Sequence, residues 1–199
     1  MNKWNIRFQS EDYVYGKEPN VFLEEFQKKL KLSGEALAIA EGEGRNAVYL
    51  AEQGMEVTTW DFAESGLAKT NKLAGERGVE VSTKLVDLNE ANWTESTWDE
   101  IVCVFGRFPT ELREKTLQGV KKAVKPGGYF LTEVYSPYQI PYKSGGPQNL
   151  DYLYKPEEFL KIFADWRIIH FFLGEITRNE GEMHTGLAHV IQFVGQKPE

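Results

Sequence analysis

Short apolar runs alternate, along the chain of 199 residues, with longer stretches in which apolar residues recur every three or four positions. The short runs predict β-strands, and the longer stretches predict helices that each bury one face. Alternation of this kind is typical of a parallel sheet covered by helices. Strands are expected at 36–40, 57–60, 79–86, 101–105, 129–135, 166–177 and 187–194, and helices at 22–30, 47–51, 64–77 and 112–124 and after Pro156.

Polar residues and glycines at the ends of these stretches predict where several helices begin and end. Asn20 and Thr110 are suited to cap the N-termini of the helices that follow them. Gly34 and Gly78 lie just past two predicted helix ends, where glycine is favoured. The sequence Lys-Pro-Gly-Gly at 125–128 is expected to break the helix before it.

The length predicts one domain over residues 1–199, because domains commonly hold about 100 to 200 residues. Within it, residues 1–35 are expected to form an N-terminal helical cap segment. The stretch 136–155 contains prolines and glycines without a clear period, and we expect it to form a lid over a substrate. The link between the last two strands contains Asn179 and Gly181, so an antiparallel hairpin is expected at one edge of the sheet.

Composition and charge exclude several classes of protein. The 23 basic and 30 acidic residues give a net charge of −7 without a basic stripe, so binding to nucleic acid is not expected. No apolar run approaches the roughly 18 residues of a membrane span, and the N-terminus lacks the apolar segment of a secretory signal. We therefore expect a cytoplasmic protein that does not contact membranes. The single cysteine, Cys103, cannot form an internal disulfide, and its apolar strand places it in the core.

The sharpest chemical signal is a strand that runs through two glycines into a helix, Ala-Ile-Ala-Glu-Gly-Glu-Gly-Arg-Asn-Ala at 38–47. Gly42 and Gly44 are expected to let a ligand approach the backbone, and the helix is expected to present free N–H groups to it. Asp61 follows about 20 residues later, the usual offset of an acid that binds a ribose. The pattern predicts a site for a cofactor that contains a nucleoside.

Electrostatics favour S-adenosylmethionine (SAM) over the dinucleotide NAD at this turn. NAD would bring a pyrophosphate, whereas SAM brings an ammonium group and no phosphate. Glu41 and Glu43 lie in the turn, and their charges would repel a desolvated phosphate but suit an ammonium group. Asp87, at the end of the third strand, is placed to accept a hydrogen bond from an adenine amino group, and Phe62 offers the adenine an apolar face.

The glycine turn is one of four motifs that belong together: Glu-Gly-Glu-Gly-Arg-Asn-Ala-Val-Tyr-Leu at 41–50, Val-Thr-Thr-Trp-Asp at 57–61, Asp-Leu at 87–88 and Pro-Gly-Gly at 126–128. Together they resemble the class I SAM-dependent methyltransferases, and most of all the tellurite-resistance (TehB-like) and thiopurine-methyltransferase-like branch. The resemblance covers roughly residues 36–135 and extends more loosely to residues 13–20 and the terminal hairpin. One departure is Glu41, where much of the superfamily has aspartate.

The resemblance implies an α/β, Rossmann-like, doubly wound sheet of seven mostly parallel strands, with helices on both faces and the last strand antiparallel. The site is implied at the carboxyl edge, where the strand order reverses. Glu41 and the two glycines would hold the methionine end of SAM, Asp61 the ribose, and Asp87 with Leu88 the adenine. The implied cofactor-binding residues are Glu41, Gly42, Gly44, Arg45, Asn46, Asp61, Phe62, Asp87, Leu88 and Phe105.

Methyl transfer from a sulfonium is an in-line displacement, so the protein mainly supplies alignment and exclusion of water. The sequence lacks the Asn/Asp-Pro-Pro-Tyr/Phe motif of amino-nitrogen methylation and the Pro-Cys nucleophile of cytosine methylation. With the acidic net charge, this favours a small-molecule acceptor such as a thiol or a metalloid oxyanion. Two alternatives remain, an NAD-binding oxidoreductase and a SAM-binding module without catalysis.

The sequence identifies no catalytic residue outright. Arg107 is a candidate for binding an anionic substrate, Tyr15 for closing over the cofactor, and His184 for a general base. Glu133 is either a substrate contact or a solvent-facing or paired carboxylate. The histidines are not spaced as metal ligands, so no metal is expected. The acceptor and the oligomeric state stay open.

Overall fold

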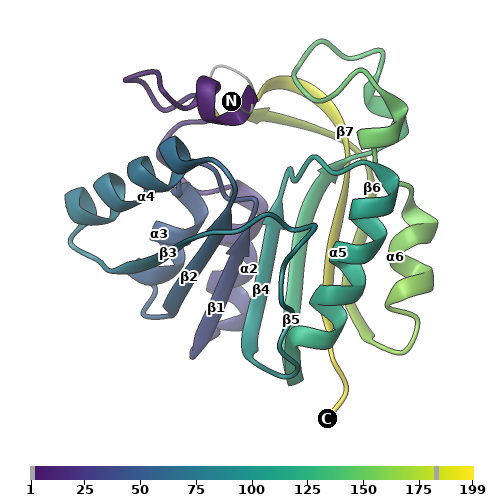
Figure 1. Cartoon of the computed structure of the whole chain (residues 1–199). Helices are drawn as coiled ribbons and strands as arrows, with labels where there is room; N and C mark the ends of the chain where they lie inside the picture. The colour runs from purple at the N-terminus through teal and green to yellow at the C-terminus, as the bar shows by residue number, and fades with distance from the viewer. Residues whose placement is uncertain (1–2, 182–183) are drawn as a thin grey trace.

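The structure is a computed structural model that describes residues 3–181 and 184–199, and within them seven strands form one sheet (Figure 1). The sheet order is β3-β2-β1-β4-β5-β7-β6. The strands β1 to β5 are parallel, and β7 is antiparallel to both of its neighbours. The predicted fold class is therefore confirmed. The strands are β1 (Glu35–Ile39), β2 (Glu56–Asp61), β3 (Val81–Leu85), β4 (Trp98–Val104), β5 (Val124–Tyr135), β6 (Arg167–Asn179) and β7 (Thr185–Gln196).

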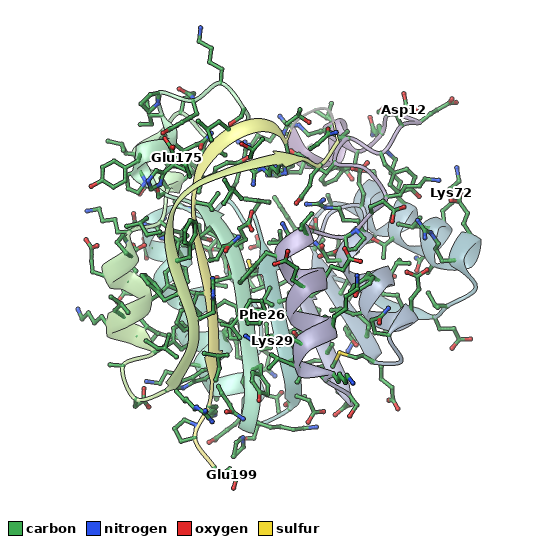
Figure 2. All side chains as sticks on the ribbon, turned by 180° about the vertical axis from the view of Figure 1, so that it is seen from behind. Asp12, Phe26, Lys29, Lys72, Glu175 and Glu199 are labelled. Carbon is green, nitrogen blue, oxygen red and sulfur yellow. The ribbon has the colours of Figure 1, made fainter. Side chains whose placement is uncertain are left out.

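Helices cover both faces of the sheet, as Figures 1 and 2 show from opposite sides. One group of helices lies on one face and a second group lies on the other. The two groups pack separate apolar clusters against the strands. Because side chains alternate along a strand, Ala36 and Ala38 of β1 join the first core while Leu37 and Ile39 join the second. The first group is α2 (Val21–Leu30), α3 (Arg45–Glu52) and α4 (Glu64–Arg77), and the second is α5 (Thr110–Ala123) and α6 (Pro156–Ile162).

The strand order reverses between β1 and β4, which are hydrogen-bonded neighbours in the middle of the sheet. The chain proceeds outward from β1 through β2 and β3 on one side, and from β4 through β5 on the other. Ligands of doubly wound sheets bind beyond the carboxyl ends of the strands at such a reversal. The fold therefore places a site beyond Ile39 and Val104.

The chain crosses this same edge at its N-terminal end (Figure 1). We call residues 3–16, which include the short helix α1 (Lys3–Arg7), the N-terminal strap. The strap is tied to α4, because Ser65 donates its backbone N–H to the Asn5 side chain (2.9 Å) and Tyr13 donates its hydroxyl to the Lys69 carbonyl (3.0 Å). The strap therefore lies over the carboxyl ends of the strands as a cover.

Two of the predicted helix boundaries are confirmed. Asn20 caps α2, since its side-chain oxygen accepts the backbone N–H of Leu23 (3.0 Å). Gly78 ends α4 in the left-handed conformation at φ 69°. The helix α2 ends at Leu30, as predicted, but the left-handed residue that caps it is Lys31. Gly34 lies three residues further on, with φ 98°.

The prediction that Thr110 caps α5 was wrong. Thr110 is the first residue of the helix, and it donates both its backbone N–H (3.1 Å) and its hydroxyl (2.5 Å) to the Asp151 carboxylate. The capping oxygen thus comes from a residue 41 positions away, in the predicted lid stretch. Local sequence patterns do not reveal a cap of that kind. The lid stretch itself contains two short 3₁₀ helices, η1 (Pro137–Gln139) and η2 (Leu150–Tyr152).

The Lys-Pro-Gly-Gly sequence ends α5 as expected but lies inside β5 rather than before it. Val124 already pairs with Trp98, and the register of β4 and β5 shifts before Glu100 pairs with Tyr129. The extra residues form an irregularity in the ladder, where proline and glycine are tolerated. The predicted antiparallel hairpin is confirmed, with β6 at the edge of the sheet.

Candidate functional site

A pocket opens at the carboxyl edge, between the N-terminal strap and the ends of the central strands. Its walls come from the strap, from the turn after β1, from the end of β2, from the segment after β4 and from the link between β6 and β7. The residues that line it are Trp4, Phe8, Tyr15, Gly16, Ala40, Glu41, Gly42, Glu43, Arg45, Asn46, Asp61, Phe62, Val104, Phe105, Gly106, Arg107, Phe108 and His184. Seven of the ten predicted cofactor residues are among them. Asp87 and Leu88 line a neighbouring hollow instead, and Gly44 lines neither.

The backbone is strained where β1 and β4 end at this pocket. Ala40 has φ 50° and Phe105 has φ 53°, in the left-handed region that residues with a Cβ rarely adopt. Hydrogen bonds hold both residues in place, from Ala40 N–H to the Trp60 carbonyl (2.8 Å) and from Phe105 N–H to the Glu133 carbonyl (2.8 Å). Strain of this kind is concentrated at ligand sites, where surrounding structure maintains it.

Asp61 joins the end of β2 to the glycine turn. One carboxylate oxygen accepts the backbone N–H of Gly42 (2.9 Å), and the other accepts that of Ala63 (2.8 Å). The side chain is buried, and burial raises its pKa despite these backbone donors. The Phe62 backbone also donates to this carboxylate. A carboxylate has about four acceptor positions, so Asp61 can still accept a hydrogen bond from a ligand in the pocket.

Glu41 caps the helix that follows the glycine turn. Its Oε1 accepts the backbone N–H groups of Asn46 (2.7 Å) and Ala47 (3.0 Å), and its Oε2 accepts the Asn46 side-chain amide (3.3 Å). Burial raises the pKa of Glu41, and these hydrogen bonds oppose the rise. The first N–H groups of α3 are therefore already bonded, contrary to the expectation that they would be offered to a ligand.

The two glycines are needed for packing of the chain against itself. A Cβ on Gly42 would lie 2.9 Å from the Phe8 ring, and one on Gly44 would lie 2.6 Å from the Thr70 side chain. Both glycines also have positive φ, at 67° and 90°. The reason for glycine here differs from the prediction, because the strap and α4 occupy the space in which we expected a ligand.

Glu43, the second acid of the turn, has a cationic partner. Its carboxylate pairs with the Lys69 ammonium (2.7 Å), and the Glu43 side chain is 3% exposed. The charge that was expected to act on a ligand is thus neutralised within the chain. Of the two turn glutamates, Glu41 is the one that offers its charge to the pocket.

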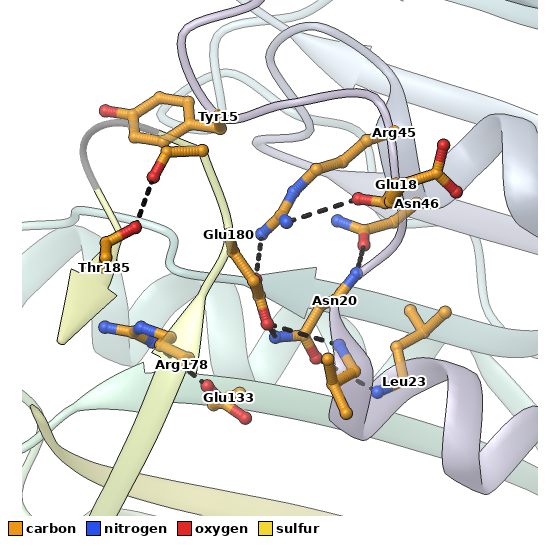
Figure 3. Close-up of polar contacts among 12 residues, drawn as sticks. Tyr15, Glu18, Asn20, Leu23, Arg45, Asn46, Glu133, Arg178, Glu180 and Thr185 are labelled. Carbon is orange, nitrogen blue, oxygen red and sulfur yellow. Dashed lines mark hydrogen bonds and ion pairs between the residues drawn. The ribbon is translucent and has the colours of Figure 1, made fainter. Parts of the chain in front are cut away.

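Arg45 and Asn46 contribute to the pocket wall but mainly tie the turn to distant parts of the chain (Figure 3). Arg45 pairs with Glu180 at 2.8 Å, and both side chains are buried. Asn46 accepts the backbone N–H of Asn20 at 2.9 Å, and the Asn20 amide donates in turn to Glu180 at 3.2 Å. These contacts join α3, α2 and the end of β6.

The neighbouring hollow lies beyond the ends of β2 and β3. The residues that it shares with the main pocket are Ala40, Asp61, Phe62, Arg107 and Phe108. Leu88 is buried in its wall, whereas Asp87 is exposed and accepts the backbone N–H of Asn89 (2.9 Å) in a tight turn. An apolar wall beside a carboxylate at the edge suits a flat nitrogen heterocycle with an amino group. The main pocket and this hollow together have the form of an extended cleft.

The side of the main pocket under the strap, which we call the acceptor half, is made of aromatic and basic side chains. Arg107 lies where this half adjoins the hollow and lines both. Trp4 stacks on Phe8 (centroids 5.7 Å apart), and Phe8 meets the edge of Tyr15 (6.4 Å). The guanidinium groups of Arg7 and Arg107 lie 4.8 Å and 5.3 Å from the centroid of the Trp4 ring. Sequence patterns pointed to Tyr15 and Arg107 here but missed Trp4, Arg7 and Phe8, since nothing in the sequence shows that the strap folds over the pocket.

Charge on this side is not balanced. Arg7 donates to the Tyr15 hydroxyl (2.8 Å), and neither Arg7 nor Arg107 forms an ion pair with a carboxylate of residues 3–181 and 184–199. Partial burial lowers the pKa of Arg107 without removing its charge at neutral pH. The acceptor half is thus suited to an anion.

His184 lies in this half, 4% exposed, with its ring packed against three others. These belong to Tyr15 (4.6 Å), Phe105 (4.6 Å) and Tyr135 (5.9 Å). Burial, together with the charges of nearby arginines, lowers the pKa of His184 to about 2. The imidazole is therefore neutral at physiological pH and accepts a proton poorly, so the geometry gives the suggested role of general base no support.

Glu133 and Arg178 form a buried pair behind the acceptor half (Figure 3). Their side chains are 2% and 3% exposed and meet at 3.2 Å, and Gln192 donates to the second oxygen of Glu133 (2.8 Å). Burial raises the pKa of Glu133 to about 7, although Arg178 opposes the rise. Arg178 also lies 4.3 Å from the centroid of the Phe105 ring. Of the alternatives left open for Glu133, the structure shows the paired carboxylate.

Comparisons with known proteins agree on one family. The family model of "Tellurite resistance protein TehB" matches residues 13–188. A "Probable S-adenosyl-L-methionine-dependent methyltransferase TehB" of Haemophilus influenzae is 30% identical over 146 residues, which are 72% of this chain and 48% of that protein. A "2-heptyl-1-hydroxyquinolin-4(1H)-one methyltransferase" of Mycobacteroides abscessus is 28% identical over 120 residues, 59% of this chain and 53% of that protein. The chain thus spans about half the length of the curated relatives it matches.

Solved structures share the fold. The crystal structure of TehB from Haemophilus influenzae superposes with a TM-score of 0.72 at 20% identity, covering 98% of this chain and 65% of that one. A structure described under "Conversion of a Disulfide Bond into a Thioacetal Group during Echinomycin Biosynthesis" superposes with a TM-score of 0.77 at 14% identity, covering 96% and 88%. Among the described residues, no helix is both long and apolar enough to cross a lipid bilayer.

Proposed function

Since the chain belongs to the family of the tellurite resistance protein TehB, we propose that it is a SAM-dependent methyltransferase with a small-molecule acceptor. The observation that carries this proposal is the order of carboxylates along the cleft. Asp61 is the last residue of β2, and Glu41 and Asp87 come just after β1 and β3. The three acids thus run from the main pocket out to the neighbouring hollow. This order matches the order of charged and polar groups along SAM.

The donor set of the cleft fits SAM part by part. Asp61 would accept a hydrogen bond from a ribose hydroxyl. The hollow lined by Phe62, Leu88 and Asp87 would hold the adenine between apolar side chains with a carboxylate at its amino edge. Glu41 would attract the ammonium group, because Glu43 is already paired with Lys69.

The same geometry disfavours the alternative, an NAD-dependent oxidoreductase. A dinucleotide places its pyrophosphate on the N-terminal N–H groups of the helix after the glycine turn. Here the N–H groups of Asn46 and Ala47 are bonded to Glu41, so a phosphate would meet a carboxylate instead of donors.

In the proposed reaction, SAM supplies a methyl group on a positively charged sulfur. The chain's own contribution is alignment and exclusion of water, because Phe8 and Tyr15 of the strap and Phe105 after β4 cover the pocket. Arg107, without an anionic partner in the described chain, would hold an anionic acceptor. A thiolate or metalloid oxyanion is a nucleophile without further deprotonation, which suits a site whose histidine accepts protons poorly.

Calorimetric titration with S-adenosylhomocysteine, SAM and NAD in parallel tests this proposal. We expect micromolar binding of the first two and none of NAD. Methyl transfer is then measured as production of S-adenosylhomocysteine with thiols, selenite and tellurite as acceptors. Tight binding of NAD would overturn the cofactor assignment, and cofactor binding without turnover on any acceptor would leave a SAM-binding module without catalysis.

A further inference from the structure

We propose that Glu133 is the counter-ion that lets the pocket accept the positively charged sulfur of SAM, and that loss of its charge shifts the preference of the pocket towards S-adenosylhomocysteine. This inference rests on the methyltransferase function proposed above and names a residue that determines which form of the cofactor is bound. The two compounds differ by one methyl group and one positive charge. The preference between them therefore reports the electrostatic potential beside the sulfur.

Arginine side chains gather around the acceptor half of the pocket. Arg7 and Arg107 form no ion pair with a carboxylate of residues 3–181 and 184–199. Arg45 is paired with a carboxylate of the β6–β7 link at 2.8 Å, and Arg178 is paired with Glu133 at 3.2 Å. Like charges repel, so the binding of a sulfonium depends on how many of these guanidinium groups are neutralised.

Arg178 lies close enough to the pocket for its charge to act there. Its guanidinium is 4.3 Å from the centroid of the Phe105 ring, and Phe105 lines the pocket. The Glu133 carbonyl also accepts the Phe105 N–H at 2.8 Å, so the ion pair and this wall of the pocket are held together. Buried surroundings screen a charge far less than water does. An uncompensated guanidinium behind Phe105 would therefore repel a cation in the pocket.

The groups around the Glu133 carboxylate identify Arg178 as the cation that it compensates (Figure 3). Gln192 of β7 donates to its second oxygen at 2.8 Å, and the His170 ring of β6 lies beyond, 3.3 Å from the Gln192 side-chain oxygen. Two further charges act on Glu133 with opposite signs and are paired with each other. They are those of Glu180 and Arg45.

Arg178 forms no ion pair with a second carboxylate in the part of the chain that the structure describes. Its other hydrogen bond goes to the Tyr135 hydroxyl, which is neutral because burial raises its pKa to about 12. Burial also raises the pKa of Glu133 to about 7, so protonation removes the compensating charge while Arg178 keeps its own. The preference for SAM should therefore weaken as the pH falls through about 7.

Parallel calorimetric titrations with SAM and S-adenosylhomocysteine give the ratio of their dissociation constants, Kd(SAM)/Kd(S-adenosylhomocysteine), in which the contacts common to both compounds cancel. At pH 8 and low ionic strength, we expect Glu133→Gln to raise this ratio at least about fivefold, because Arg178 is then uncompensated. Removal of both charges, by Glu133→Gln with Arg178→Met, should return the ratio to the wild-type value. In the wild type the ratio should rise by a similar factor between pH 8 and pH 5.5, and Glu133→Gln should abolish this dependence.

Glu100→Gln is the matched control. Glu100 is also a buried acid whose pKa burial raises to about 7, but it lies near the start of β4, at the end of that strand away from the pocket. Its substitution should leave the ratio and the pH dependence of the ratio as they are in the wild type. A rise in Glu100→Gln as large as that in Glu133→Gln would overturn the proposal.

Equal ratios in Glu133→Gln and the wild type at pH 8 would also overturn it, as would a ratio that stays raised in the double variant or a pH dependence that survives Glu133→Gln. Thermal unfolding shows which variants are folded. If Glu133→Gln does not fold, the wild type decides alone, and a ratio that is the same at pH 8 and pH 5.5 would exclude the role of Glu133. Absence of S-adenosylhomocysteine binding by the wild type would instead remove the proposed function itself.

Discussion

The two ends of the cleft are built in different ways. At the cofactor end, Glu41, Asp61 and Asp87 each accept backbone N–H groups from residues no more than 19 positions away. At the acceptor end, Tyr15 and His184 meet across the pocket, although they are far apart along the chain. One end is a set of local turns at strand ends, and the other is assembled from the strap, the segment after β4 and the link between β6 and β7.

Because the two ends are built differently, cofactor binding and substrate preference can vary independently. Local turns keep their geometry as long as the sheet exists, so the cofactor end is determined by a few short motifs. The acceptor end depends on how the strap and the β6–β7 hairpin pack, and its charge balance depends on which arginines find partners. Arg178 is paired with Glu133, whereas Arg107 has no such partner in the described residues. Substrate preference can therefore change without altering the cofactor end.

The largest expected effect comes from disrupting the buried ion pair that lies behind the acceptor half. Glu133→Leu leaves the buried guanidinium of Arg178 unpaired, and the loss of one partner of a buried pair costs about 3 to 5 kcal/mol. Urea unfolding measures the free energy of unfolding. The double variant Glu133→Leu with Arg178→Leu should recover part of this loss, because no buried charge remains. A loss below about 1 kcal/mol in the single variant would show that Arg178 reaches solvent or another partner.

The second prediction concerns Glu100, a buried acid at the opposite end of β4 from the site. Unlike Glu133, Glu100 has no arginine partner in the described residues, so it serves as a comparison for the buried pair. Gln27 donates its amide to both carboxylate oxygens (2.6 Å and 2.5 Å), and burial raises the pKa of Glu100 to about 7. The folded state therefore binds a proton that the unfolded state, with a pKa near 4.5, releases. Stability should fall as pH rises from 4.5 to 7, by up to about 3 kcal/mol.

Glu100→Gln isolates this contribution, since the amide has the shape of the protonated acid. The variant should match the wild type below about pH 4 and exceed its free energy of unfolding by about 3 kcal/mol near pH 8. Glu133 titrates in both proteins, so the difference between the two urea-unfolding profiles reports Glu100. Parallel profiles for the two proteins would contradict the raised pKa.

The third prediction breaks the cofactor end. Asp61→Ala removes the acceptor for the Gly42 and Ala63 N–H groups as well as the proposed ribose contact. We expect the Kd for S-adenosylhomocysteine to rise at least about tenfold, the equivalent of roughly 1.4 kcal/mol or more for a charge-assisted hydrogen bond. Calorimetry measures it. Asp87→Ala should have a smaller effect because that carboxylate is exposed, and an unchanged Kd in Asp61→Ala would remove Asp61 from the site.

The smallest expected effect comes from deleting the strap. Removal of residues 1–16 takes away Trp4, Phe8 and Tyr15 but leaves Asn20 and α2 in place. The dissociation rate of S-adenosylhomocysteine should rise about fivefold, near 1 kcal/mol, because water then reaches the cleft. Stopped-flow displacement measures the rate, and thermal unfolding confirms that the shortened protein is folded. A dissociation rate equal to that of the full chain would show that the strap only packs against the domain and does not retain the cofactor.

Much of the fold was predictable from local patterns, because each strand and helix carries its own periodicity and several carry their own end signals. Asn20 and Gly78 act where their residue types suggest. Thr110 failed as a cap, since the oxygen that bonds its N–H belongs to Asp151, in another loop. Lys31 caps α2 in a conformation for which glycine is favoured, so the residue type alone did not identify the capping position.

The sequence by itself determined the order of strands and helices, the glycine turn and the acids at the strand ends, because these depend on contacts between near neighbours along the chain. Only the tertiary structure decided that Phe8 covers Gly42, that Lys69 neutralises Glu43, and that Arg107 borders the ring of Trp4. These contacts join segments that are far apart in sequence, and no local periodicity encodes which distant side chain will share a pocket. The charge and the aromatic character of the acceptor end are therefore properties of the folded chain.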